Sequence, residues 1–118
     1  MSRRSRVDLG TFTGNSAPVI LGSMDAAFAF IEAGSGGSTV HFEALVGSPG
    51  SESWARLGSS SVVVPANTKE VWPLTVLNPG MSGDDPRFPM PYTPGTVRVV
   101  QTAGDAAMVK IEMTRTLR

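Results

Sequence analysis

The sequence contains no cysteine and only one histidine among its 118 residues. Without cysteine there is no disulfide framework, no thiolate zinc site and no cysteine nucleophile, and the composition fits synthesis in a reducing compartment. Long apolar runs are also missing, because the longest covers residues 26–31, against roughly 20 residues for a membrane helix. The early arginines precede no apolar segment, so we expect neither a signal peptide nor a membrane span.

The chain has no excess charge of either sign, with ten basic and ten acidic side chains. This balance argues against general nucleic-acid binding. The positive charge is concentrated at the start, where residues 1–8 hold Arg3, Arg4 and Arg6 against Asp8. We expect residues 1–8 to form a flexible basic N-terminal arm that complements an acidic surface on a neighbouring subunit. A solvated, disordered chain end is the alternative.

Helical patterns are scarce, because 13 glycines and 9 prolines are spread through the chain. Alternation of apolar and polar side chains recurs instead, which is typical of half-buried strands. Two segments, 39–46 and 108–116, show it most clearly. The residues expected to face the core are Val40, Phe42, Ala44 and Val46 in the first segment and Val109, Ile111 and Met113 in the second.

Further strands are expected at 96–101 and 61–64, the latter a buried strand ending at Pro65. Weaker candidates are residues 7–13, 18–21, 26–32 and 70–77. The glycine-rich segment 34–38 is expected to be the turn between two antiparallel strands, 26–33 and 39–47. Pro73 cannot donate a ladder hydrogen bond, so its strand should lie at a sheet edge or carry a bulge.

These strands predict an all-β fold, a single antiparallel β-sandwich with either jelly-roll or immunoglobulin-like topology. We expect the sandwich domain to span residues 9–118, with a long proline-rich loop projecting at 78–95. Five of the nine prolines lie in that loop, together with the apolar residues Phe88, Met90 and Tyr92. We expect these three side chains to bind a partner, although they could instead cover the domain's own core.

No motif for catalysis or for cofactor or metal binding is found, so the chain is not expected to be an enzyme. His41 lies on the polar face of its strand beside Glu43 and is expected to be exposed and inert. Neither a Gly-x-Ser-x-Gly elbow nor a phosphate-binding Gly-x-x-x-x-Gly-Lys-Ser/Thr is present. The adjacent Asp84 and Asp85 do not make a calcium loop. Trp54 and Trp72 are expected to pack in the core, with a carbohydrate-stacking platform as the alternative.

Two segments resemble known modules. Residues 42–58 contain a strand, a small-residue turn and Trp54-Ala55-Arg56-Leu57-Gly58, and residues 97–104 precede a final alternating strand. This pattern is similar to hairpins of discoidin-like binding modules and of small auxiliary proteins of tailed-phage virions, which include capsid decoration or cement proteins. The resemblance implies a protein without active site or cofactor that works by contact, often as a trimer bridging capsid subunits. It carries over no individual binding residue.

The leading interpretation is therefore a virion structural protein that decorates or stabilises a capsid, made in the host cytoplasm. Its partners would be the major capsid protein, other virion subunits and further copies of itself, without nucleic acid or membrane. Arg3, Arg4 and Arg6 and the apolar loop residues would make the contacts. The alternative is a carbohydrate- or receptor-binding sandwich, for example on a phage tail.

Overall fold

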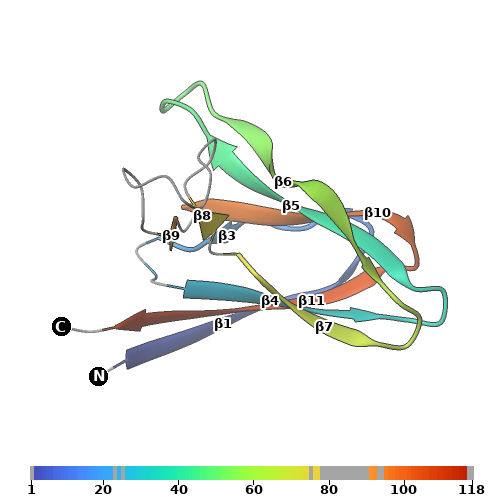
Figure 1. Cartoon of the computed structure of the whole chain (residues 1–118). Helices are drawn as coiled ribbons and strands as arrows, with labels where there is room; N and C mark the ends of the chain where they lie inside the picture. The colour runs from blue at the N-terminus through green and yellow to red at the C-terminus, as the bar shows by residue number, and fades with distance from the viewer. Residues whose placement is uncertain are drawn as a thin grey trace.

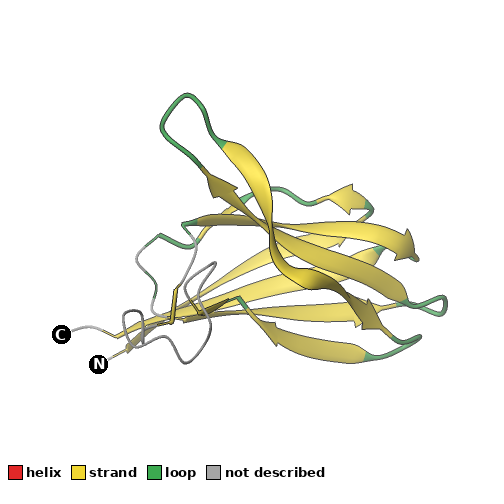
Figure 2. Cartoon of the chain, turned by 45° about the horizontal axis from the view of Figure 1, so that its top comes forward, coloured by secondary structure: helices red, strands yellow, loops and turns green. Residues whose placement is uncertain are grey.

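The computed structural model describes residues 2–22, 24, 26–74, 76–77, 91–92 and 95–116. These residues form two antiparallel sheets packed face to face, as the sequence predicts (Figure 1). Strands account for nearly all of the regular structure, and Figure 2 shows no helix in the part of the chain that is described. Within those residues, accordingly, no helix is long and apolar enough to cross a membrane.

The first layer is a four-stranded sheet with the order β1-β11-β4-β7. Its strands are β1 (Ser2–Phe12), β11 (Ala107–Thr116), β4 (Ala26–Ala33) and β7 (Lys69–Pro73). The second layer has the order β2-β10-β5-β6, with β3 also pairing with β10. Its strands are β2 (Gly14–Asn15), β3 (Val19–Ile20), β10 (Thr96–Gly104), β5 (Ser38–Val46) and β6 (Ser53–Val64). The short strands β8 (Val76–Leu77) and β9 (Pro91–Tyr92) pair with each other.

The connectivity decides between the two topologies that the sequence leaves open. We take β2 and β3 as one interrupted strand and leave out the small β8-β9 ladder, which gives eight sandwich strands along the chain. Counted in chain order, the sheet β1-β11-β4-β7 then consists of strands one, eight, three and six, and the sheet β2-β10-β5-β6 consists of strands two, seven, four and five. Nested antiparallel pairings of this kind are those of a jelly roll, which consists of two interlocked Greek keys.

The core lies between the sheets and follows the predicted alternation. Val109, Ile111 and Met113 of β11 are buried, as are Val97 and Val99 of β10. Of the predicted inward residues on β5, three are buried: Val40, Phe42 and Ala44. The fourth, Val46, is exposed because β5 and β6 extend beyond the sandwich as a projecting hairpin (Figure 1).

Residues 61–64 alternate rather than forming a fully buried strand. Val62 and Val64 face the core, whereas Val63 is 67% exposed. Pro73 ends β7 at the edge of the four-stranded sheet, as its missing N–H group predicts.

The N-terminal segment differs from the flexible arm that its charge suggests. Residues 2–12 form β1, which pairs with β11 from Ser2 opposite Thr116 to Phe12 opposite Ala107. A bulge interrupts the ladder between Asp8 and Gly10, where the Gly10 N–H group donates to Asp8 Oδ1 at 2.8 Å. The physical reason is alternation, since Val7, Leu9 and Phe12 pack against the core while the charged residues between them face outward.

The glycine-rich segment 34–38 also differs from the expected hairpin turn. β4 pairs with β11 and β7, whereas β5 pairs with β10 and β6, so the segment crosses from one sheet to the other. The connection from β10 to β11 crosses in the same way and is therefore not a closing hairpin. Of the segments that resemble known modules, only 42–58 is a hairpin, with Leu45 opposite Trp54.

The two crossings meet at one corner of the sandwich. The Asp105 N–H group donates to the carbonyl oxygen of Gly37 at 2.7 Å, and the Gly36 N–H group donates to Asp105 Oδ2 at 2.7 Å. Gly104 has a φ of +79°, and a Cβ atom there would lie 2.6 Å from the Gly37 carbonyl oxygen. Glycine is required at position 104 both by its backbone conformation and by this close approach.

We expect Gly104→Ala to lower the free energy of unfolding by about 3 kcal/mol or more, from left-handed strain plus the clash. Gly22→Ala is the matched control, because Gly22 has a φ of +57° and a Cβ atom added there would meet nothing within 4 Å. It should cost only about 1–2 kcal/mol. Urea unfolding of both variants checks this, and equal losses would show that the corner contact does not constrain the fold.

Candidate functional site

The outer face of the four-stranded sheet carries apolar side chains that face away from the core. Phe28 and Phe30 of β4 are 39% and 38% exposed, and Val71 of β7 is 56% exposed. Phe30 lies directly opposite Val71, and Phe28 lies opposite Pro73. These four neighbouring residues form what we call the apolar strip. Contiguous exposed apolar surface of this kind commonly marks an interaction site.

Strands β1 and β11 carry charged residues on the same outer face. Glu112 is the centre of this group, since its carboxylate lies 3.1 Å from Arg4 Nε and 2.9 Å from an Arg6 terminal nitrogen. Glu112 is opposite Phe28 in the sheet register, and Lys110 is opposite Phe30. We call Arg4, Arg6, Lys110 and Glu112 the charged strip. It runs directly alongside the apolar strip.

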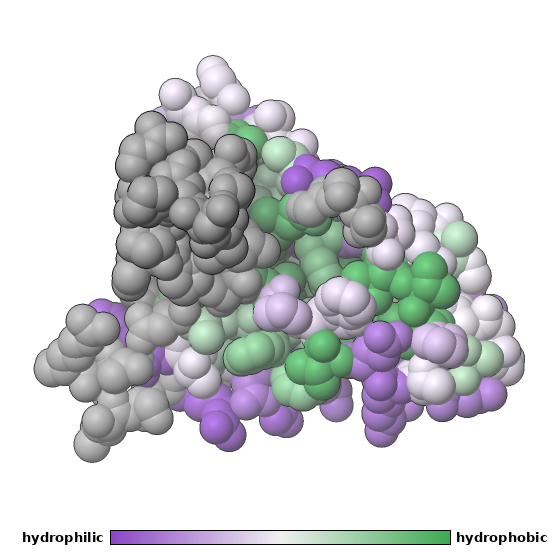
Figure 3. Space-filling view, viewed as in Figure 1, coloured by the Kyte–Doolittle hydropathy of each residue, from purple (hydrophilic) through white to green (hydrophobic). Residues whose placement is uncertain are grey.

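The surface of this layer has a mixed character when the molecule is seen from the side. In Figure 3, apolar and strongly polar residues lie next to one another along the lower, four-stranded layer. Because the strand register fixes which residues are neighbours, the arrangement is a direct consequence of the β1-β11-β4-β7 order.

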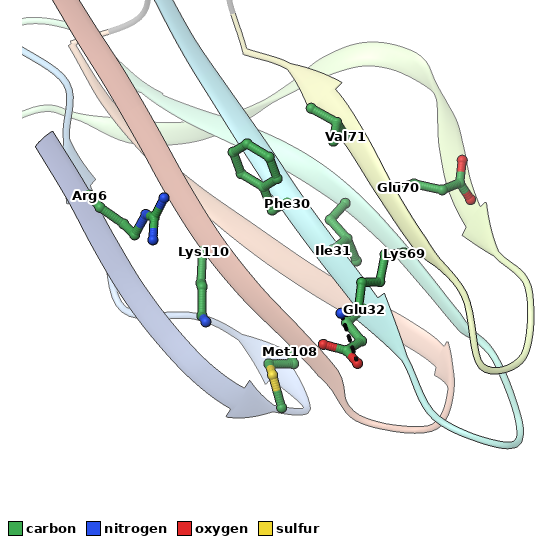
Figure 4. A pocket seen from close by; sticks show the side chains of 9 residues that line it. All are labelled: Arg6, Phe30, Ile31, Glu32, Lys69, Glu70, Val71, Met108 and Lys110. Carbon is green, nitrogen blue, oxygen red and sulfur yellow. Dashed lines mark ion pairs between the residues drawn. The ribbon is translucent and has the colours of Figure 1, made fainter. Parts of the chain in front are cut away.

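A shallow groove of about 270 Å³ lies on this face (Figure 4). Phe30, Val71 and Met108 supply apolar walls, and cationic side chains approach from both sides. The remaining lining residues are Arg6, Ile31, Glu32, Lys69, Glu70 and Lys110. Lys69 lies 4.0 Å from Glu32, a loose ion pair at the rim. The groove can therefore hold apolar groups next to anionic ones.

The structure brings some of the predicted contact residues into this face. Arg4 and Arg6 belong to the charged strip. Arg3 lies on β1 opposite Arg115, and Tyr92 lies on β9 opposite Val76, but their side chains are not described. Phe88 and Met90 lie outside the described residues, as do Asp84 and Asp85.

The apolar strip was not predicted. Residues 26–33 alternate between Ala26, Phe28, Phe30 and Glu32 on one face and Ala27, Ala29, Ile31 and Ala33 on the other, so both sets are mostly apolar. The structure buries the small set, Ala27, Ala29, Ile31 and Ala33, and exposes the phenylalanines. The signal available in the sequence was Glu32, a charged residue that shares its face of the strand with Phe28 and Phe30.

A second polar cluster lies on the outer face of the other sheet. Arg98 donates from Nε to Glu43 Oε1 at 2.7 Å, and His41 Nε2 donates to Glu43 Oε2 at 2.9 Å. The Arg98 guanidinium also lies 4.3 Å from the centre of the Trp54 ring, a cation–π contact. His41 is thus largely covered rather than exposed as predicted, since its side chain is paired with Glu43 and only 11% exposed.

The cluster has an electrostatic consequence for its central carboxylate. The hydrogen bond from His41, aided by the hydrogen bond and positive charge of Arg98, lowers the pKa of Glu43 below its ordinary value of 4.5, despite partial burial. His41 Nδ1 is buried without a hydrogen-bond partner among the described residues. The cluster ties β5 to β10 through the Arg98–Glu43 pair.

Neither tryptophan lies in the core, contrary to the favoured prediction. Trp54 is half-buried on the outer surface under Arg98, because it pairs with Leu45, which belongs to the outward-facing set of β5. Trp72 is 38% exposed on the edge strand β7, where its indole N–H group donates to Glu70 Oε1 at 3.3 Å. Among the described residues, no three His, Asp or Glu side chains cluster in a way that could hold a metal ion.

Comparisons with known proteins add little. No family model matches the chain, and no curated protein matches it. A solved structure titled "Structure of infectious bursal disease virus Gx strain" is similar, with a TM-score of 0.48 and 11% sequence identity. The match covers 97% of this chain and 32% of that chain. A similarity of this size carries no argument about function. What the described residues define is a jelly-roll sandwich with an amphipathic outer face.

We expect Glu43→Gln to lower the free energy of unfolding by about 1–3 kcal/mol at neutral pH, because Arg98 and His41 lose an ionised acceptor. Since the folded-state pKa of Glu43 is depressed, its contribution is complete above pH 4.5 and is lost as pH falls through the folded-state pKa. The difference from the original protein should therefore shrink below pH 4.5. Chemical unfolding over a pH series measures it. Glu52→Gln, at an exposed turn residue, is the control, and a difference that persists into acid would contradict the assignment.

Proposed function

We propose that this protein is a structural component of a virion that stabilises or decorates a capsid by protein–protein contact, without catalysis. The observation that carries the proposal is the apolar strip beside the charged strip on the outer face of the four-stranded sheet. A surface of this composition matches the centre and the rim of a protein interface.

The energetic roles of the two strips differ. Burying a large apolar side chain stabilises a complex by about 1.5–3 kcal/mol, so Phe28, Phe30 and Val71 are the residues that supply affinity. Arg4 and Arg6 are exposed at the side of the apolar strip and remain bound to Glu112. Charges at such a position contribute to partner choice and association rate more than to affinity.

The fold supports the same proposal by analogy. Jelly rolls serve as capsid domains and as lectin domains, so the fold is compatible with a virion role without establishing it. The resemblance of residues 42–58 to hairpins of virion auxiliary proteins points the same way, and that segment is a hairpin in the structure. The proposed partners are the major capsid protein or other virion subunits, and repeated copies on a lattice would multiply one weak contact.

Replacing Phe30 by Asp should abolish co-sedimentation of the purified protein with capsids of the virus that encodes it. The substitution places a charge in the centre of the apolar strip without touching the core. Val63→Asp is the control, because Val63 is also an apolar strand residue that is exposed, and it lies on the other sheet. Full capsid binding by Phe30→Asp, or loss of binding by Val63→Asp alone, would contradict the assignment of the contact face.

The second candidate function is carbohydrate or receptor binding, and the exposure of Trp72 favours it. Trp54 is the weaker platform because Arg98 covers one face of its ring. If this second function is correct, glycan titration should produce a saturable change in tryptophan fluorescence, and Trp72→Phe should remove that change. The proposed structural role predicts no saturable change. A saturable change that Trp72→Phe removes would replace the structural role with this one.

A further inference from the structure

The two sheets of the sandwich have free strand edges, and β1 forms the longest regular one. Among the described residues, β1 pairs with β11 on one side and with no strand on the other (Figure 1). It is 11 residues long, and its ladder from Ser2 to Asp8 runs without a bulge or a proline. An unprotected edge of this kind is a template for a further strand.

The other edges each carry a feature that limits pairing. β7 has five residues and ends in Pro73. β2 and β3 have two residues each. β6 is long, but its register with β5 shifts between Leu57 and Val62, so its edge is interrupted in the middle. A partner strand therefore fits the edge of β1 best.

The side chains of β1 are self-complementary when the strand meets a second copy of itself. Arg6 and Asp8 lie on the outer face, on either side of Val7, which packs against the core. In an antiparallel pair with Val7 opposite Val7 of the second copy, each Arg6 faces an Asp8 of the other copy. Both side chains are accessible, since Asp8 is exposed and the Arg6 side chain is 63% exposed even while bound to Glu112. Two ion pairs would form together, and opposite charges in opposed positions stabilise a sheet.

The register inside one molecule extends this complementarity. Asp8 is opposite Lys110 in the β1–β11 ladder. Arg6 is opposite Glu112 in the same ladder. A row across the joined sheets would contain Lys110 and Asp8 of one copy, followed by Arg6 and Glu112 of the other. The charge in this row alternates in sign at every step, and a two-fold axis repeats the row in the opposite direction. A second copy provides this order by symmetry, which makes it the occupant that the charges favour.

The neighbouring registers are less favourable. A ladder centred on Arg6 would place the two Arg6 side chains opposite each other, and one centred on Ser5 would place Arg4 opposite Arg6. A ladder centred between two residues would set outward side chains against inward ones. The bulge after Asp8 limits pairing toward the end of the strand. The register centred on Val7 is therefore the one that the side chains select, and the shortness of its regular part predicts a weak contact.

We propose that two copies of this protein join antiparallel along β1, with Val7 at the two-fold axis, so that their four-stranded sheets form one continuous sheet. The inference goes beyond the proposed function, because it concerns the edge of this sheet rather than its outer face. Five strand spacings of about 4.8 Å would put the two β4 strands about 24 Å apart. The dimer would thus carry two apolar strips on one surface, and two strips bind a lattice more strongly than one.

Single cysteine variants test the register directly, because the chain has no cysteine of its own. Val7→Cys should form a disulfide-linked dimer under mild oxidation, since directly opposed Cβ atoms lie within about 5 Å of each other. Ser5→Cys is the matched control, because Ser5 is half-buried on the same face of β1 and would lie opposite Leu9 of the second copy. Non-reducing electrophoresis measures the linked fraction. Linkage of Ser5→Cys in preference to Val7→Cys, or of neither variant, would overturn the inference.

Exchange of charges tests the ion pairs in solution. Sedimentation velocity over a concentration series should show a monomer–dimer equilibrium that salt weakens. Asp8→Arg and Arg6→Asp should each weaken the dimer about tenfold or more, because each variant places two like-charge pairs at the contact. An equimolar mixture of the two variants should restore dimers, since the basic residues of one chain then face the acidic residues of the other. Urea unfolding of each variant separates loss of pairing from loss of folding, and Phe30→Asp is the control that should dimerise like the original protein.

Other outcomes are distinct. A monomer at every concentration, a trimer, or a mixture that stays monomeric would overturn the inference. If the original protein is monomeric but co-sediments with capsids through Phe30, the inference fails while the proposed function stands. A salt-weakened dimer with a Val7→Cys cross-link, combined with failure to bind capsids, would support the inference while the proposed function fails.

Discussion

The strict alternation of β11 is the constraint on which the rest of the structure depends. β11 lies between β1 and β4, and it directs Val109, Ile111 and Met113 into the core while Lys110 and Glu112 face outward. A shift of one residue in its pairing would bury the charges and expose the core. The register that builds the hydrophobic core therefore also aligns the charged strip with the apolar strip on β4 and β7.

This coupling gives a small sandwich a packed core and an exposed apolar face at once. The apolar side chains of the outer face are not needed for the core, since the inner row of β4 is filled mainly by alanines. They are held instead on a rigid sheet whose edges and corners are fixed by backbone bonds, such as that from Asp105 to Gly37. A preordered apolar surface loses little conformational entropy when a partner covers it.

Much of the fold could be predicted from the sequence, because alternation and turn residues carry local information. The inward sets on β5 and β11 are confirmed except for Val46, and so is the edge position of Pro73. The predictions that were wrong concern features that depend on which strands pair with each other, and local sequence patterns do not carry that information. Segment 34–38 has the composition of a hairpin turn, but only the pairing of β4 with β11 shows that it joins two sheets. The charge of the N-terminus suggested an arm, while its hydrophobic alternation at Val7 and Leu9 indicated a strand. For the site, Arg4 and Arg6 were predicted, but Phe28 and Phe30 were not, since both faces of that strand are mostly apolar and Glu32 alone marks the outward one.

Hydroxyl-radical footprinting of the assembled and free protein tests the central claim most directly, because it reports the side-chain exposure of each residue. If the outer face of the four-stranded sheet is the contact surface, oxidation of Met108, Phe28 and Phe30 should fall on assembly. Oxidation of Trp54, on the opposite sheet, should not change. Protection of Trp54 with unchanged reactivity of Met108 and both phenylalanines would contradict the account.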